Sequence, residues 1–148
     1  MNDLLLIPLI KPEKNKLEEA YEVAGDVAID FQGARLMVPK FFQFDGASVP
    51  SAFWGAIGSP FSPRLMRASV FHDWLSYTHQ LTRDDTNELF YRMFVADKVN
   101  KVKATIMKQA VVVSSEWYWN NDKDDDAYLA ALAKRIEADG RVPKDYGL

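Results

Sequence analysis

The chain has 148 residues, of which 48% are hydrophobic and 13% aromatic, and a formal net charge of −3. This length and apolar content predict one soluble domain, residues 1–148, and exclude an intrinsically disordered chain. The absence of cysteine excludes disulfides, thiolate metal ligands and a cysteine nucleophile, and it fits a reducing compartment. The acidic balance and the scattered basic residues argue against a nucleic-acid partner.

The first part of the chain, residues 4–44, is expected to form antiparallel strands and hairpins. The apolar run Leu4–Ile10 is too short to span a bilayer, so no membrane span is predicted. No small-residue cleavage site of a signal peptide follows it. We therefore expect an N-terminal strand there.

Alternation and turn residues subdivide the following segment. Residues 21–31 end in an alternation of apolar with small or polar side chains, which is typical of a half-buried strand. Gln32-Gly33 predicts a hairpin turn, and residues 35–38 predict the returning strand. Pro39 cannot donate a ladder hydrogen bond and should end that strand. Residues 41–44 predict one more short strand.

From Pro50 onward the pattern becomes helical, and strands followed by helices define an α+β class. We expect a mainly helical C-terminal part of three long helices plus a short one, ahead of a last amphipathic helix. The short helix is predicted at residues 51–57. The first long helix starts at Ser62-Pro63, because serine caps a helix and proline suits its first position. A second starts at Thr82, with Asp85 completing a capping-box pattern.

A further helix is predicted from about Lys101 to Trp119 by apolar residues at helical spacing: Val102, Ile106, Ala110 and Val113. The aromatic group Glu116–Trp119 could be a binding platform, although aromatic residues at a helix end more often close a core. The run Asp122–Asp126 is interpreted as a solvated loop before a last amphipathic helix, 127–138. It lacks the glycine and glutamate of a calcium loop.

His72 and Asp73 stand out because both are expected in the middle of a largely apolar helix. An imidazole and a carboxylate are costly to bury unless they are hydrogen-bonded or bound to a metal. His72 shares a helical face with Leu65, Ala68 and Leu75, so its ring should point inward. The candidate polar partners elsewhere are Asp45, Ser48, His79, Arg83 and Asn87.

Three ordered motifs between residues 35 and 95 resemble the phage and prophage family known as domain of unknown function 1353. They are Phe44-Asp45-Gly46-Ala47-Ser48-Val49-Pro50, His72-Asp73-Trp74-Leu75 and Arg83-x-x-Thr86-Asn87-x-x-Phe90. Two positions depart from the family pattern: Ser76 stands where a tyrosine follows the His-Asp pair, and Asn87 replaces an aspartate. The resemblance implies a phage or prophage origin rather than a particular reaction.

Two interpretations of these motifs stay open. In the functional one, Asp45, His72, Asp73 and Asn87 line a cleft in which His72 acts as a general base. Asp45 and Asp73 would orient the imidazole or hold a divalent cation, whose identity the residues do not define. In the structural one, Asp45 and Ser48 cap a turn, and His72 and Asp73 join a buried hydrogen-bonded network with Arg83 paired to an aspartate.

The resemblance therefore leads to two expectations about function. The first is a phage- or prophage-encoded accessory or virion (tail-associated) protein, which binds a phage or host protein through its surface in the host cytoplasm or the virion. The second is a small hydrolase, assisted by a divalent metal, with His72 and Asp73 as catalytic residues together with Asp45. Ser48, Arg83 and Asn87 would then contribute to binding. The oligomeric state is not predicted.

Overall fold

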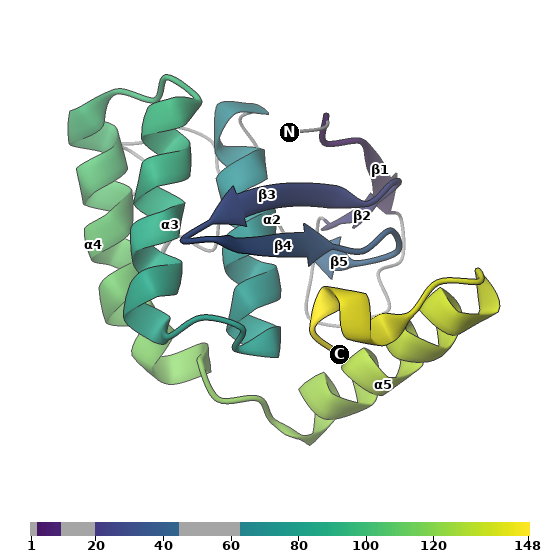
Figure 1. Ribbon diagram of the computed structural model, residues 1–148. Helices are drawn as coiled ribbons and strands as arrows, with labels where there is room; N and C mark the ends of the chain where they lie inside the picture. The colour runs from purple at the N-terminus through teal and green to yellow at the C-terminus, as the bar shows by residue number, and fades with distance from the viewer. Residues whose placement is uncertain (1–2, 10–19, 45–62) are drawn as a thin grey trace. The chain divides into compact units, whose positions relative to one another are not determined.

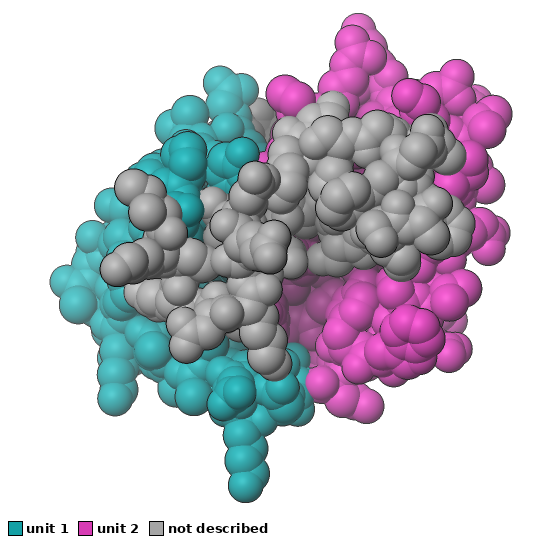
Figure 2. Space-filling view, turned by 180° about the vertical axis from the view of Figure 1, so that it is seen from behind, with its two compact units in different colours: residues 1–45, 121–148 teal, residues 46–120 magenta. Residues whose placement is uncertain are grey.

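The computed structural model describes residues 3–9, 20–44 and 63–148. Antiparallel strands come first and helices follow, so the predicted α+β class is confirmed (Figure 1). The chain divides into two compact units (Figure 2). The first combines residues 1–45 with 121–148, and the second is residues 46–120. The short helix expected at residues 51–57 lies outside the described residues.

The strands that the structure describes in the first unit form two small antiparallel sheets. Strands β1 (Leu6–Leu9), β2 (Ala20–Val23) and β5 (Gln43–Phe44) form one sheet in the order β1-β2-β5. Strands β3 (Val27–Phe31) and β4 (Ala34–Val38) form the other as a hairpin. The predicted strands are therefore present, and β4 ends directly before Pro39, as expected.

The β3–β4 hairpin closes at the predicted turn. Gln32 and Gly33 both have a positive φ, 51° and 78°, which is the backbone of a two-residue type I′ turn. In β3, Asp30 is exposed, as the alternation predicts. Ala28 is buried, however, and so are its neighbours Val27 and Ile29. The strand is therefore covered on both faces at Ala28.

Helix α5 (Lys123–Ala138) begins earlier than the sequence pattern predicted. The side chain of Asp122 accepts a hydrogen bond from the Asp125 N–H, and the Asp125 carboxylate accepts one from the Asp122 N–H. This reciprocal capping box makes the acidic run the first turn of the helix, where negative charge is favoured. The interpretation of this run as a loop was therefore wrong.

Helix α5 is tied to the strand β5 by an aromatic contact and one hydrogen bond. The hydroxyl of Tyr128 accepts a hydrogen bond of 2.8 Å from the Gln43 N–H. The ring of Tyr128 lies 6.5 Å from that of Phe42, which is fully buried. The short 3₁₀ helix η2 (Pro143–Tyr146), which the sequence did not predict, contacts β4 and α5.

The described part of the second unit, residues 63–120, forms a layer of three helices, α2 (Pro63–Thr78), α3 (Arg83–Ala96) and α4 (Lys101–Tyr118). Helix α3 lies between the other two (Figure 1). Thr82 caps α3 by accepting the Asp85 N–H, which confirms the predicted start. Among the described residues, no helix is both long enough and apolar enough to cross a membrane.

The buried face of α4 differs from the apolar stripe that predicted the helix. The residues that α4 buries are Ala104, Met107, Ala110, Val111, Ser114 and Ser115. Val102 and Val113 are 68% and 60% exposed, and Trp117 is 82% exposed. The expectation that the terminal aromatic residues close a core is therefore wrong for Trp117. Helix α4 has two apolar faces, and periodicity alone does not show which of them is covered.

Candidate functional site

The candidate site is centred on His72, in the middle of α2. The side chain of His72 is 1% exposed, and Leu65, Ala68 and Leu75 on the same helix face are buried too. The predicted inward direction of the imidazole is thus confirmed. Ser76 donates a hydrogen bond of 2.7 Å to the backbone carbonyl of His72 from the next helical turn.

A chain of hydrogen bonds runs from His72 through α3 to α4. The Nε2 atom of His72 lies 2.8 Å from Oδ1 of Asn87, which is the fifth residue of α3. The Nδ2 group of Asn87 donates to Oγ of Ser115 at 3.5 Å, and Ser115 donates to the carbonyl of Val112 at 3.3 Å. The Oδ1 atom of Asn87 can only accept, so Nε2 of His72 carries the proton in this contact.

Two aromatic rings enclose the rest of the imidazole. The centroid of the Phe90 ring lies 4.7 Å from that of His72 at an interplanar angle of 52°. The Tyr118 ring lies edge-on at 6.4 Å. These rings come from α3 and α4, so His72 on α2 contacts both of these helices.

Asp73 is an acidic residue near the other imidazole nitrogen. Its Oδ1 atom lies 4.0 Å from Nδ1 of His72, and its side chain is 11% exposed. This distance is longer than a hydrogen bond. The two groups therefore form an ion pair only when the imidazole carries both protons.

Arg83 lies at the surface and pairs with a glutamate rather than with an aspartate. Its guanidinium is 3.9 Å from the Glu116 carboxylate, and the two side chains are 38% and 64% exposed. His79, the other histidine, donates a 2.7 Å hydrogen bond from Nε2 to the Trp119 carbonyl, and its ring stacks on that of Trp119. In these contacts the partners of Arg83 and His79 are therefore residues other than His72.

Asp45 and Ser48 lie outside the described residues, so the site is described without these two residues of the first motif. Of the predicted set, the structure brings together His72, Asp73 and Asn87. Among the residues that the structure describes, no group of three or more acidic or histidine side chains is placed to hold a metal ion.

A second polar cluster, in the first unit, was not predicted. The carboxylate of Asp26 accepts hydrogen bonds from the Lys40 N–H, from the Arg141 guanidinium and from the Tyr146 hydroxyl. Burial, followed by the hydrogen bond to Asp26, raises the pKa of Tyr146 above its ordinary value. In the sequence, Gly25-Asp26 signals only a break between strands, and nothing local points to partners so far along the chain.

Phe41 lies beside this cluster in a strained backbone conformation. Its φ is 83°, at the third position of a turn closed by the hydrogen bond from the Phe42 N–H to the Pro39 carbonyl. That position of a type II turn favours glycine. Cations cover the ring, with the Arg135 guanidinium 4.2 Å and Lys40 Nζ 4.8 Å from its centroid. Cation–π attraction therefore helps to offset the backbone strain.

Residues 17–111 match the family described as Protein of unknown function (DUF1353), and the chain belongs to this family. Two curated relatives are uncharacterized proteins of Sinorhizobium fredii (strain NBRC 101917 / NGR234). The protein y4jT is 38% identical over 62% of this chain and 27% of its own length, and y4iH is 34% identical over 56% of this chain and 35% of its own length. The chain thus spans only about a third of these relatives. No solved structure matches it.

Proposed function

We propose that the chain is a phage- or prophage-encoded accessory or virion (tail-associated) protein that acts by binding a phage or host protein. The burial of His72 is the observation that carries this proposal. A general base must come within hydrogen-bond reach of the proton that it removes. Here the imidazole side chain is 1% exposed, and its Nε2 atom is occupied by Asn87.

The rest of the network supports a role in packing. Asn87 and Ser115 continue the hydrogen bonds to the backbone of α4, and Phe90 fills the space beside the ring. A buried network of hydrogen bonds favours one arrangement of helices over others. The phage origin rests on the three sequence motifs that resemble the family and on the family match.

The substitution His72→Gln tests the proposal. The amide nitrogen of glutamine can donate to Asn87 Oδ1 as Nε2 does, but it cannot act as a base at neutral pH. In a phage that lacks its own copy of the gene, we expect the His72→Gln protein to restore plaque formation when its melting temperature matches the wild type. His72→Leu, which leaves Asn87 unpaired, serves as the destabilised control. Loss of plaques with a natively folded His72→Gln protein would contradict the proposal.

Mass spectrometry of purified phage particles addresses the place of action. A virion component is expected at a constant ratio to the capsid protein, whereas an accessory factor remains in the host cytoplasm. Crosslinking in infected cells should then join the chain to one protein of phage or host. A chain that crosslinks to no protein in either fraction would be incompatible with a binding role.

The alternative is a small hydrolase with His72 as the base and a divalent cation as cofactor. The observation in its favour is the Asp73 carboxylate, 4.0 Å from Nδ1 of His72. This alternative predicts that magnesium, manganese, zinc or calcium raises the melting temperature, and that Asp73→Asn abolishes the rise. The binding proposal predicts no metal-dependent rise that requires Asp73.

A further inference from the structure

Helix α4 carries an apolar face directed away from the core of its unit. Val102, Ile106, Val113 and Trp117 recur at spacings of four, seven and four residues, which places them in one stripe along the helix. Val102, Val113 and Trp117 are more than half exposed, at 68%, 60% and 82%. At 1.5 Å per residue the stripe is about 22 Å long. A tryptophan this exposed is unusual outside interfaces.

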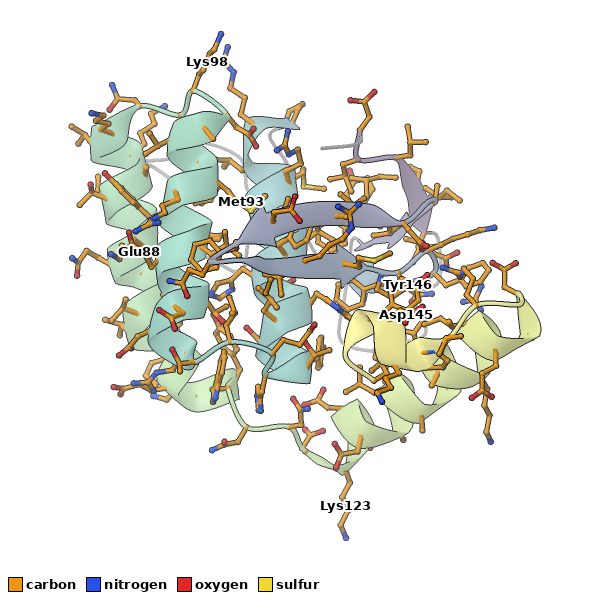
Figure 3. The ribbon with its side chains drawn as sticks, in the orientation of Figure 1. Glu88, Met93, Lys98, Lys123, Asp145 and Tyr146 are labelled. Atoms are coloured by element: carbon orange, nitrogen blue, oxygen red, sulfur yellow. The ribbon has the colours of Figure 1, made fainter. Side chains whose placement is uncertain are left out.

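The two ends of this face carry opposite charges. One end has three lysines, because the α3–α4 turn and the start of α4 supply Lys98, Lys101 and Lys103. Figure 3 shows Lys98 extending away from the helices at that turn. At the other end, Glu116 lies against the start of α3 through its ion pair with Arg83. The first turn of α3 adds Asp84 and Asp85 there.

Contacts between α3 and α4 fix the direction of this charge gradient. Arg83 at the start of α3 meets Glu116 near the end of α4, and Glu88 meets Lys108 at 2.6 Å one turn further along α3. The two helices are therefore antiparallel. The acidic first turn of α3 lies beside the C-terminal end of α4, and one surface carries a basic end, an apolar middle and an acidic end.

We infer that this face binds the same face of a second copy of the chain, with the two α4 helices antiparallel about a two-fold axis. Such a surface is self-complementary only in that direction, because each basic end then meets the partner's acidic end. Parallel helices would place lysines against lysines. Trp117 of each copy would pack near Val102 of the other. This inference does not depend on the proposed function.

Sedimentation equilibrium of the full chain from about 1 to 200 μM tests the inference, since a single helix pair of modest area favours micromolar affinity. We expect a monomer–dimer equilibrium. Trp117→Glu should weaken it at least 30-fold. Val142→Glu is the matched control, because Val142 is 55% exposed in the other unit and gains the same charge. The control should dimerise as the wild type does.

A charge exchange tests the orientation. Lys101→Glu and Glu116→Lys should each weaken the dimer roughly tenfold, and the double variant should restore most of the affinity because the exchanged charges again meet as opposites. A wild-type chain that remains monomeric throughout would overturn the inference, as would an unchanged dimer in Trp117→Glu. A double variant weaker than both single variants would overturn the antiparallel pairing. Circular dichroism of each variant confirms that the helices are intact.

Discussion

Tyr146 donates a hydrogen bond of 2.6 Å to Asp26, although the two residues are 120 positions apart in the sequence. Arg141 joins the same carboxylate and also donates to the Tyr146 hydroxyl at 3.2 Å. Together the three side chains connect the β2–β3 turn to the segment around η2. Among the hydrogen bonds of the first unit described above, this contact has the greatest sequence separation. We therefore expect its loss to lower the free energy of unfolding.

Asp26→Asn is expected to lower the free energy of unfolding by roughly 2 kcal/mol, since it removes the charge that faces Arg141 in a partly buried site. Asparagine still offers an oxygen to the Lys40 N–H but has one acceptor oxygen fewer, so the effect combines the lost charge with a lost hydrogen bond from Arg141 or Tyr146. Asp30→Asn is the matched control. Asp30 pairs with Arg35 at 3.6 Å in an exposed position, and its loss should cost less than about 0.5 kcal/mol. Urea denaturation measures both, and equal effects would contradict the prediction.

The raised pKa of Tyr146 predicts a stability loss in alkali. Burial and the hydrogen bond to Asp26 raise this pKa above 10.0 in the folded chain. A folded-state pKa above the unfolded value gives stability that is complete below about pH 10 and lost as the pH rises through the folded pKa. Tyr146→Phe removes this term, so its stability should fall less steeply above pH 10 than that of the wild type. Parallel slopes in denaturation at pH 9 to 11 would show that Tyr146 does not contribute.

His72 and Asn87 should be energetically coupled. Asn87→Ala leaves the buried Nε2 group of His72 without its partner, at a cost of about 1–3 kcal/mol. A double-mutant cycle with His72→Ala is expected to give a coupling energy of at least about 1 kcal/mol. Ser76→Ala is the control on the same helix, because Ser76 bonds only to the His72 carbonyl and alanine favours helix. A coupling energy near zero would mean that the contact adds nothing to stability.

Gly33→Ala should destabilise the chain by about 1–2 kcal/mol, because its φ of 78° is unfavourable for any residue with a Cβ atom. A Cβ atom at Gly33 would meet nothing within 4 Å, so backbone strain is the sole cause. Gly25→Ala is the matched control. Gly25 has equal space but no positive φ, and alanine there should be neutral or slightly stabilising. Thermal melts compare the two, and similar losses would refute the explanation by strain.

Local signals predicted much of the fold. Pro63, Thr82 and the Gln32-Gly33 turn each act within a few residues, and the structure begins or ends an element where they indicate. The start of α5 was missed although its signal is local too. Asp122 and Asp125 form a capping box with aspartate in place of the usual glutamate, and the charge density of the run suggested a solvated loop instead.

Long-range pairings could not be predicted. Asn87 was among the candidate partners of His72, but its selection depends on how α3 packs against α2 and not on any spacing in the sequence. The cluster of Asp26 with Arg141 and Tyr146 joins residues that are far apart in the sequence, so it becomes visible only in the folded first unit. The exposed stripe of α4 illustrates the same limit, since the pattern revealed the helix but not the face that its neighbours cover.

The division of the chain also determines which unit is completed first during synthesis. Residues 46–120 form one unit and are translated before α5 and η2, which complete the unit to which the five strands belong. At about 5–20 residues per second, Tyr128 and Tyr146 are added roughly 4 to 20 seconds after the last strand. Throughout that interval the Gln43 N–H and the Asp26 carboxylate are without Tyr128 and Tyr146. We therefore expect the nascent strands to depend on a ribosome-associated chaperone during this interval.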